Sequence, residues 1–150
     1  MEELNLPKHT YRIKNNQKQK LIFDNIRKKF VALTPEEWVR QNFISYLVEN
    51  KKFPSSLLSI EFAFKLNNTS KRSDIVSFGR KGEPVLIVEC KASNVKITQK
   101  VFDQIARYNM KLKVKFLIVT NGLVHYCCKF DNEKQSFIFL NDIPEYSQIC

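Results

Sequence analysis

The apolar positions of the chain follow two different periods, and the changes between them mark the elements that we expect. Residues 35–50 repeat apolar side chains at helical spacing, after a threonine, a proline and a glutamate that form a helix-start signature. Residues 59–65 are rich in β-forming side chains that alternate in part, which predicts a strand. We therefore expect a helix whose apolar face packs against a sheet.

The middle and the end of the chain predict further strands and a second helix. Residues 74–78 and 85–91 form the second and third strands, and the third begins with four consecutive apolar residues, as in a central strand covered on both faces. Thr98 caps a helix that extends to about residue 112. The remaining strands are expected at 115–120, 123–130 and 137–140, the last of them at an edge of the sheet. Asn121-Gly122, between the first two, is a strong hairpin signal. This order predicts one mixed α/β domain.

Composition and charge add a partner to this picture. With 150 residues and 43% hydrophobic content, the chain can bury one core. The net charge of +10 favours an anionic partner such as nucleic acid, although a merely basic surface is the alternative. Because about a third of the basic residues precede position 30, we expect a partly ordered basic arm at 1–19 and a folded domain at 20–150.

The four cysteines have neither a Cys-x-x-Cys pair nor histidines at zinc spacing, so we expect no structural zinc. Cys90 and one of the neighbours Cys127 and Cys128 are expected on buried strand faces, as small apolar residues. Reduced thiols fit a cytoplasmic protein, and the N-terminus does not resemble a signal peptide. No apolar run reaches the roughly 20 residues needed to span a bilayer, so we expect no membrane partner.

Two carboxylates are expected to face each other across a hairpin. A turn centred between Lys81 and Gly82 puts Asp74 opposite Glu89, with Cβ atoms about 5 Å apart. Such a pair is destabilising unless a cation lies between the carboxylates. Strand alternation puts Lys91 on the same face as Glu89. The pattern therefore predicts a divalent-metal site with a lysine beside it.

Hard oxygen ligands suit magnesium, and the backbone carbonyl of Cys90 is a third candidate ligand, with water and a phosphate oxygen for the rest. Glu37 in the first helix is a further candidate, although its position completes the capping box. Lys91 would orient the attacking water or stabilise the transition state. In the alternative interpretation, Glu89 and Lys91 are ordinary strand-end charges, paired with each other or with Arg72.

Four other side chains have both a functional and a structural interpretation. Gln104 and Tyr108 lie four apart on one face of the second helix, where both could reach a phosphate or a base. Tyr108 could equally be a core aromatic. Arg40 is either a phosphate contact or a surface arginine. His125 stands in an apolar strand and is expected to be a satisfied structural histidine.

Four segments carry the chemistry together: Thr34-Pro35-Glu36-Glu37-Trp38-Val39-Arg40-Gln41, Lys71-Arg72-Ser73-Asp74, Val88-Glu89-Cys90-Lys91-Ala92 and Phe102-Asp103-Gln104-Ile105-Ala106-Arg107-Tyr108-Asn109. In this combination they resemble the restriction-endonuclease-like nucleases, also called PD-(D/E)xK nucleases. More closely, they resemble the N-terminal nuclease domain of type I restriction enzyme R subunits. The resemblance covers residues 20–145.

The resemblance implies an αβββαβ core, with a mixed central sheet flanked by helices. It implies a DNA endonuclease that depends on Mg²⁺, for which Mn²⁺ can substitute. Asp74 and Glu89 would bind the metal, and Lys91 would be the catalytic lysine. Gln104 and Tyr108 match the Gln-x-x-x-Tyr motif of helicase-associated members, where it is linked to nuclease function and DNA contact. Arg40 and Arg72 would be supporting or nucleic-acid-binding residues.

The chain also departs from that family. Ser73 stands where the family has a proline before its first acid, and 150 residues leave no space for a helicase motor. We therefore expect a small stand-alone relative whose target is selected by a helicase or specificity partner, or that cuts without specificity. Cutting both strands would require a homodimer or repeated nicking. The alternatives are a nucleic-acid-binding module with weak or lost catalysis, and an interaction protein without a nucleic-acid ligand.

Overall fold

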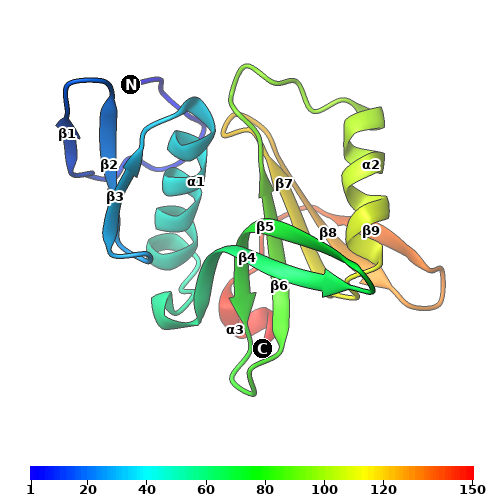
Figure 1. The fold of residues 1–150 in the computed structure, drawn as a ribbon. Helices are drawn as coiled ribbons and strands as arrows, with labels where there is room; N and C mark the ends of the chain where they lie inside the picture. Colours follow the sequence, from blue (N-terminus) through cyan, green and yellow to red (C-terminus); the bar gives the residue numbers. More distant parts are fainter.

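A small and a large β-sheet, with a helix between them, make up the computed structural model, which describes residues 1–150 (Figure 1). The small sheet has the order β1-β2-β3, and its antiparallel strands are β1 Ile13–Asn15, β2 Lys20–Asp24 and β3 Lys29–Ala32. Helix α1 follows at Pro35–Ser45 and continues as a π-helical turn at Tyr46–Asn50. A short 3-10 helix at Ser55–Leu57 leads to the large sheet.

The large sheet has the order β4-β5-β6-β7-β8-β9. Its strands are β4 Leu58–Leu66, β5 Thr69–Phe78, β6 Pro84–Cys90, β7 Phe116–Thr120, β8 His125–Asp131 and β9 Ser136–Leu140. Helix α2 at Gln99–Met110 joins the parallel neighbours β6 and β7, and all other neighbours are antiparallel. A short helix, α3, ends the chain at Tyr146–Ile149. The expected α/β fold with a mixed sheet and flanking helices is confirmed.

Local signals position both long helices. The Thr34 hydroxyl accepts a hydrogen bond from the backbone N–H of Glu37 at 3.0 Å, and the Thr98 hydroxyl caps α2 in the same way. The expected capping box of α1 is wrong in its second half. The Glu37 carboxylate accepts hydrogen bonds from Arg27 and Gln41, while the Thr34 backbone N–H donates to the carbonyl of Ala32. A tertiary contact has replaced the local one.

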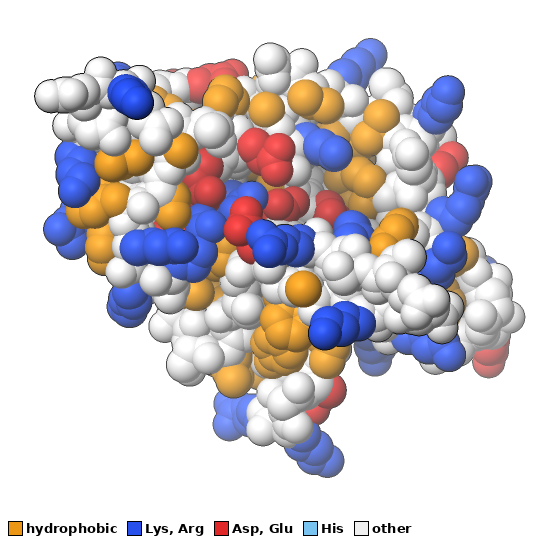
Figure 2. All heavy atoms as spheres, viewed as in Figure 1, with side chains coloured by type: hydrophobic (Ala, Val, Ile, Leu, Met, Phe, Trp, Pro, Cys, Tyr) orange, Lys and Arg blue, Asp and Glu red, His pale blue; other side chains and the backbone are white.

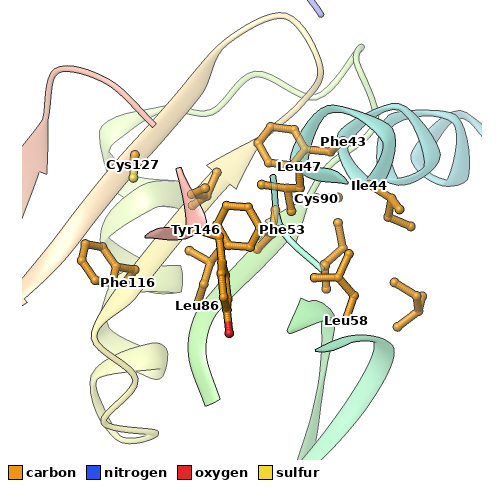
Figure 3. Close-up of a cluster of buried hydrophobic side chains, with 14 of the residues drawn as sticks. Phe43, Ile44, Leu47, Phe53, Leu58, Leu86, Cys90, Phe116, Cys127 and Tyr146 are labelled. Atoms are coloured by element: carbon orange, nitrogen blue, oxygen red, sulfur yellow. The ribbon is translucent and has the colours of Figure 1, made fainter. Parts of the chain in front are cut away.

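The large sheet is covered on both faces, which explains its apolar central strands. One cluster of buried side chains lies on the α1 side, where Phe43 and Leu47 project from the helix toward Phe53 and Cys90 (Figure 3). A second cluster lies on the α2 side and includes Phe102. Leu86 and Val88 of β6 belong to the first cluster and Ile87 to the second, as expected for a central strand.

The cysteines of β8 reveal the same two-sided burial. Cys127 joins the cluster on the α1 side and Cys128 the cluster on the α2 side, so both are buried where only one was expected. Buried surroundings raise the pKa of each of these two thiols to about 12. His125 is satisfied as expected, because its ring nitrogens meet the Thr120 hydroxyl at 2.7 Å and the Asn5 carbonyl at 2.9 Å.

The first 34 residues are more ordered than their composition suggested. The segment expected as a basic arm contributes β1, and the Asn5 backbone N–H donates to the Gly122 carbonyl at 2.8 Å. Strands β1 to β3 were not predicted, because they are only three to five residues long and rich in lysine.

The N-terminal segment approaches the large sheet closely at Gly122. This glycine has φ of +86°, and a Cβ there would lie 2.8 Å from a Leu4 side-chain carbon. No helix has both the length and the apolar composition needed to cross a bilayer.

The Asp24 carboxylate connects the small sheet to α1 by hydrogen bonds. Its side chain is fully buried and accepts hydrogen bonds from the backbone N–H groups of Ile26 and Arg27, the Arg27 side chain and the Gln41 amide. Burial alone raises the pKa of Asp24, but the hydrogen bonds and charge of Arg27 outweigh it and lower the pKa below its ordinary value of 3.8. The ionised carboxylate therefore stabilises the fold.

Asp24→Asn is expected to lower the free energy of unfolding at pH 7 by about 2–4 kcal/mol, because Arg27 would lose its buried partner. Since the folded pKa is lowered, this stabilisation is complete above the ordinary value of 3.8 and is lost as the pH falls through the folded pKa. Urea unfolding at pH 7 and in acid measures the difference, with the exposed Asp142→Asn as control. An equal deficit at both pH values would contradict this origin.

Candidate functional site

The register of β5 and β6 brings the two candidate carboxylates together. Ile75 pairs with Val88 and Val76 with Ile87, so the next position along the hairpin has Asp74 opposite Glu89, as the sequence predicted. A register shift between Ser77 and Phe78, nearer the turn, produces this alignment, because the pairing of Phe78 with Pro84 beside the turn would otherwise continue to Asp74 opposite Val88.

Asp74 is held in place from two sides. Its Oδ2 accepts a hydrogen bond from the Cys90 backbone N–H at 2.7 Å, and its Oδ1 accepts one from Arg40 Nη2 at 3.0 Å. Burial raises the pKa of Asp74 despite these two contacts, which act in the opposite direction. The carboxylate is therefore fixed in orientation but short of positive charge when ionised.

Glu89 is the less satisfied of the two carboxylates. Only 9% of the residue is exposed, and its Oε2 lies 3.2 Å from the ammonium of Lys71. Its Oε1 is buried without a hydrogen bond of good geometry, although the Ser73 hydroxyl, which also has none, lies close enough to lower the pKa of Glu89. Burial raises the pKa of Glu89, Lys71 counteracts this, and the charge of Asp74 adds to the rise. An additional cation at Oε1 would satisfy this group.

Lys91 provides a positive charge that is not paired with any carboxylate. Its backbone N–H donates to the Thr120 carbonyl at 2.8 Å, which fixes the strand end, while its side chain forms neither an ion pair nor a hydrogen bond. The side chain is half-buried, and its charge lowers the pKa values of Asp74 and Glu36, although burial raises both overall. The ammonium thus lies near the acidic cluster and is free to bind an incoming anion.

Arg40 is buried at the site, so of its two interpretations the surface arginine is wrong. It is 6% exposed, and its guanidinium contacts Glu37 at 3.3 Å, Glu61 at 3.3 Å and Asp74 at 3.0 Å. Burial lowers the pKa of Arg40, but the carboxylates of Glu37 and Asp74 more than compensate and raise it. The charge of Arg40 is therefore neutralised by carboxylates of the protein itself, and the guanidinium orients Asp74.

Glu61 enters this network through an unusual backbone conformation. It has φ of +55° in the middle of β4, where a side chain rarely adopts the left-handed region. Its neighbours Ile60 and Phe62 pair with Ile75 and Ser73, so Glu61 lies across from Asp74 without being paired to it. Backbone strain of this kind costs about 1–3 kcal/mol and accumulates at functional sites. The left-handed conformation of Glu61 could not be predicted, because neither a glycine nor a typical turn residue stands in this stretch of the sequence.

Lys71 connects the carboxylates to α2. Its ammonium lies 4.7 Å from the centre of the Tyr108 ring while it pairs with Glu89. Tyr108 therefore reaches the site through Lys71, whereas Gln104 is exposed and makes no hydrogen bond there. The side chain of Arg72 is 74% exposed and has only a 3.9 Å contact with Glu61. Of Gln104, Tyr108 and Arg72, only Tyr108 is thus linked to the carboxylates, through Lys71, and Arg72 is available to solvent.

The donor atoms fit a partly hydrated hard cation. No group of three or more histidine, cysteine, aspartate or glutamate side chains converges as a ready-made cage. Mg²⁺ does not need one, since it keeps several waters and binds through one or two carboxylates. Asp74 and Glu89 provide that pair, with the partnerless Glu89 Oε1 as the strongest indication. Glu37 is engaged by Arg27 and Arg40, and the Cys90 carbonyl stays an expected ligand.

The surroundings of the site are charged but not uniformly so. Figure 2 shows acidic side chains gathered in a hollow near the middle of this face, with lysine and arginine side chains around them. Such a rim attracts a polyanion, while the acidic floor attracts a cation. Glu61, Lys71 and Arg27 were not predicted as members of the site, because their roles depend on contacts between elements far apart in the chain.

Glu89→Gln is expected to stabilise the protein in EDTA by about 1–2 kcal/mol, because it removes a buried charge whose Oε1 has no partner. Since the folded pKa of Glu89 is raised, the wild type loses stability as the pH rises above the ordinary value of 4.5. The gain should therefore vanish in acid. Urea unfolding at neutral and acidic pH measures it, with the exposed Glu133→Gln as control; a destabilised Gln variant at neutral pH would refute it.

Comparison with known proteins gives a family and a fold. The family model described as "Type I restriction enzyme R protein N terminus (HSDR_N)" matches residues 35–144. A solved fragment assigned as an HsdR subunit of a type I restriction enzyme from Vibrio vulnificus YJ016 is similar, with a TM-score of 0.54 and 23% identity. That likeness, which supports the fold alone, covers 78% of this chain and 24% of the other. No curated protein matches the chain.

Proposed function

Because the chain belongs to the family of type I restriction enzyme R protein N termini, we propose that it is a magnesium-dependent DNA endonuclease of the PD-(D/E)xK type. The observation that carries this proposal is the alignment of the half-buried Asp74 with the buried Glu89, two carboxylates at one end of a hairpin. Arg40 and Lys71 neutralise this pair only in part, and a cation between the two carboxylates would remove the remaining repulsion. Lys91, which has no partner of its own, completes the set.

Each residue of the set has its own task in phosphodiester hydrolysis. Asp74 and Glu89 would hold Mg²⁺, or Mn²⁺ in its place, and Arg40 and the Cys90 backbone N–H keep Asp74 in the required orientation. When bound there, the metal would neutralise phosphate charge and lower the pKa of a water molecule. The ammonium of Lys91 donates to a nonbridging phosphate oxygen or to the attacking water, and so stabilises the negative charge of the transition state.

The partners that we propose follow from the same family. DNA is the substrate that fits a restriction enzyme subunit, and selection of the target falls to a helicase or specificity protein. The chain contains one carboxylate pair, and one such site cuts one strand at a time. Cleavage of both strands would then require a homodimer or two successive nicks.

A second function is supported by a different observation. Arg40 already contacts Asp74, and Lys71 already contacts Glu89, so one oxygen of each carboxylate is neutralised without a metal. This arrangement would also suit a nucleic-acid-binding module whose catalysis has become weak. Binding of DNA with a steep salt dependence, but without cleavage in any divalent metal, would favour this second function.

Cleavage assays with plasmid DNA in Mg²⁺, in Mn²⁺ and in EDTA test the proposed nuclease. We expect nicking or cutting that requires the metal and that Asp74→Ala, Glu89→Ala and Lys91→Ala each abolish. The exposed Lys96→Ala, in the loop after β6, is the matched control and should cut at the wild-type rate. Activity that persists in all three site variants would eliminate this site as the catalytic centre.

Tyr108→Leu is expected to slow DNA cleavage by about 3–10-fold, because Lys71 would no longer be held by a cation–π interaction. Tyr108→Phe keeps the ring and should retain nearly the full rate. Single-turnover cleavage by the two variants measures the difference. If the Phe variant fails as badly as the Leu variant, the hydroxyl rather than the ring is what matters, and the role assigned to Lys71 is wrong.

A further inference from the structure

The small sheet β1 to β3 lies outside the residues 35–144 that the family model covers. Residues 12–32 contain seven lysines and arginines and a single acid, Asp24, which is fully buried and paired with Arg27. The other six basic side chains are exposed and form no ion pair: Arg12, Lys14, Lys18, Lys20, Lys28 and Lys29. All the exposed charge of the small sheet is therefore positive.

The two faces of the small sheet differ in character. Ile22 and Asp24 lie on the face toward α1, where both are fully buried. Because side chains alternate along a strand, Phe23 lies on the opposite face, beside Phe30 of β3 at a ring-centre distance of 5.2 Å. This outer face combines an aromatic pair with basic side chains.

Two cations are ordered on that outer face. The Arg12 guanidinium lies 4.5 Å from the centre of the Phe23 ring, and the Lys14 ammonium lies 4.0 Å from the centre of the Phe30 ring. A cation above an aromatic ring loses part of its rotational freedom before any ligand arrives, so binding an anion costs it less entropy. Lys28, in the turn between β2 and β3, adds a third exposed charge.

The turn between β2 and β3 connects the small sheet to the acidic hollow. Arg27, in the same turn as Lys28, pairs with Glu37 at 2.9 Å and with Glu61 at 3.7 Å, and both acids also contact Arg40 of the site. Figure 2 shows basic side chains interspersed with hydrophobic ones over β1 to β3 at the left of the view, on the same face as the acidic hollow. A long anion bound in the hollow can therefore continue over the small sheet.

We infer that the β1 to β3 sheet binds the phosphodiester backbone of the DNA substrate beside the cleavage site, through Arg12, Lys14 and Lys28. The inference rests on the proposed function only in taking DNA as the ligand. The occupant must be a polyanion, because a second copy of this sheet would meet it with the same charge. Contacts to phosphates hold DNA in register without reading its sequence, which suits a cleavage domain whose target is chosen elsewhere.

Binding of a fluorescent 30-base-pair duplex to the full chain in EDTA tests the inference, since no cleavage occurs without metal. The Arg12→Gln/Lys14→Gln/Lys28→Gln variant should bind at least about 10-fold more weakly than the wild type at moderate salt. Its slope of log K against log salt should become shallower by about 2–3, because each of the replaced cations neutralises one phosphate in the wild type. The matched control, Arg80→Gln/Lys129→Gln/Lys134→Gln, removes the same charge from other exposed positions and should bind almost as tightly as the wild type.

Each other result overturns the inference. Equal weakening in both triple variants would mean that net charge, not this face, governs binding. Wild-type affinity and slope in the sheet variant would mean that DNA does not touch the sheet. Binding of the wild type to vesicles rich in phosphatidylserine, but not to DNA, would identify a membrane surface instead. Metal-dependent cleavage by the wild type with unchanged KM in the sheet variant would overturn the inference while leaving the nuclease proposal intact, whereas a wild type that neither binds nor cuts DNA would end both.

Discussion

Arg40→Leu is expected to lower the free energy of unfolding by about 3–5 kcal/mol, the cost of removing one partner from a buried ion network. Glu37, Glu61 and Asp74 would all be deprived of the guanidinium that they share. A domain of this size has only about 5–15 kcal/mol of total stability, so the loss would be a large fraction of it. Urea unfolding at pH 7 measures the loss.

The matched control for Arg40 is Arg72→Leu. Arg72 also approaches Glu61, but at 3.9 Å and with a side chain that is 74% exposed, so its removal should have almost no effect on unfolding. The deficit of Arg40→Leu should shrink in acid, where protonation removes the charges left without a partner. A variant that unfolds within about 1 kcal/mol of the wild type at pH 7 would show that the network does not hold the site together.

Lys91→Met is expected to slow cleavage by about 10²–10³-fold, the usual cost of removing one electrostatic interaction with the transition state. Methionine keeps the apolar stem of the side chain and removes only the ammonium. Since Lys91 pairs with no carboxylate in the structure, the fold should be unaffected, and thermal unfolding should match that of the wild type. Single-turnover cleavage of a duplex in saturating Mg²⁺ measures the rate.

Lys96→Met, in the exposed part of the same loop, is the control for Lys91 and should cleave normally. Binding of duplex DNA in EDTA should change by less than about threefold in Lys91→Met, because one charge among many contributes little to total affinity. More than a tenth of the wild-type cleavage rate in Lys91→Met would remove this ammonium from the mechanism. A large loss of DNA binding would instead make Lys91 a docking residue.

The parts of the site that could be predicted from the sequence depend on local geometry. The turn around Gly82, which adopts φ of +86°, makes the hairpin predictable, although the register that aligns Asp74 with Glu89 also depends on a shift between Ser77 and Phe78 that the sequence does not reveal. The caps of both long helices were predictable for the same reason, because the Thr34 and Thr98 hydroxyls bond to backbone N–H groups only three residues away. Such interactions need no knowledge of the tertiary fold.

The parts that could not be predicted depend on contacts across the chain. For Arg40 the sequence left a phosphate contact and a surface arginine open, but its buried guanidinium donates a hydrogen bond to Asp74, 34 positions later. The Glu37 carboxylate suited a capping box, yet Arg27 from the preceding turn between strands binds it instead. Glu61 needed a left-handed backbone inside a strand to reach the arginines. In each case a charged side chain forms an ion pair or hydrogen bond with a residue that the spacing along the sequence does not identify.

The small sheet was missed for a related reason. Its strands are short and lysine-rich, which is typical of a solvated arm, but Asp24 and Arg27 bind it to α1 and its aromatic pair covers the outer face. The basic charge that suggested nucleic acid from composition alone is therefore arranged on an ordered surface beside the carboxylates. This combination of charge and order is the basis of our proposal that the small sheet binds DNA phosphates.

Nicking of supercoiled plasmid DNA by the wild type and by Glu89→Gln, in Mg²⁺ and in EDTA, tests the nuclease assignment most directly. We predict that the wild type nicks the plasmid only in Mg²⁺ and that Glu89→Gln, although more stable in EDTA, does not nick it in either condition. A Gln variant that cuts at the wild-type rate, or a folded wild type that never cuts in Mg²⁺ or Mn²⁺, would contradict the assignment of Asp74, Glu89 and Lys91 as a catalytic centre.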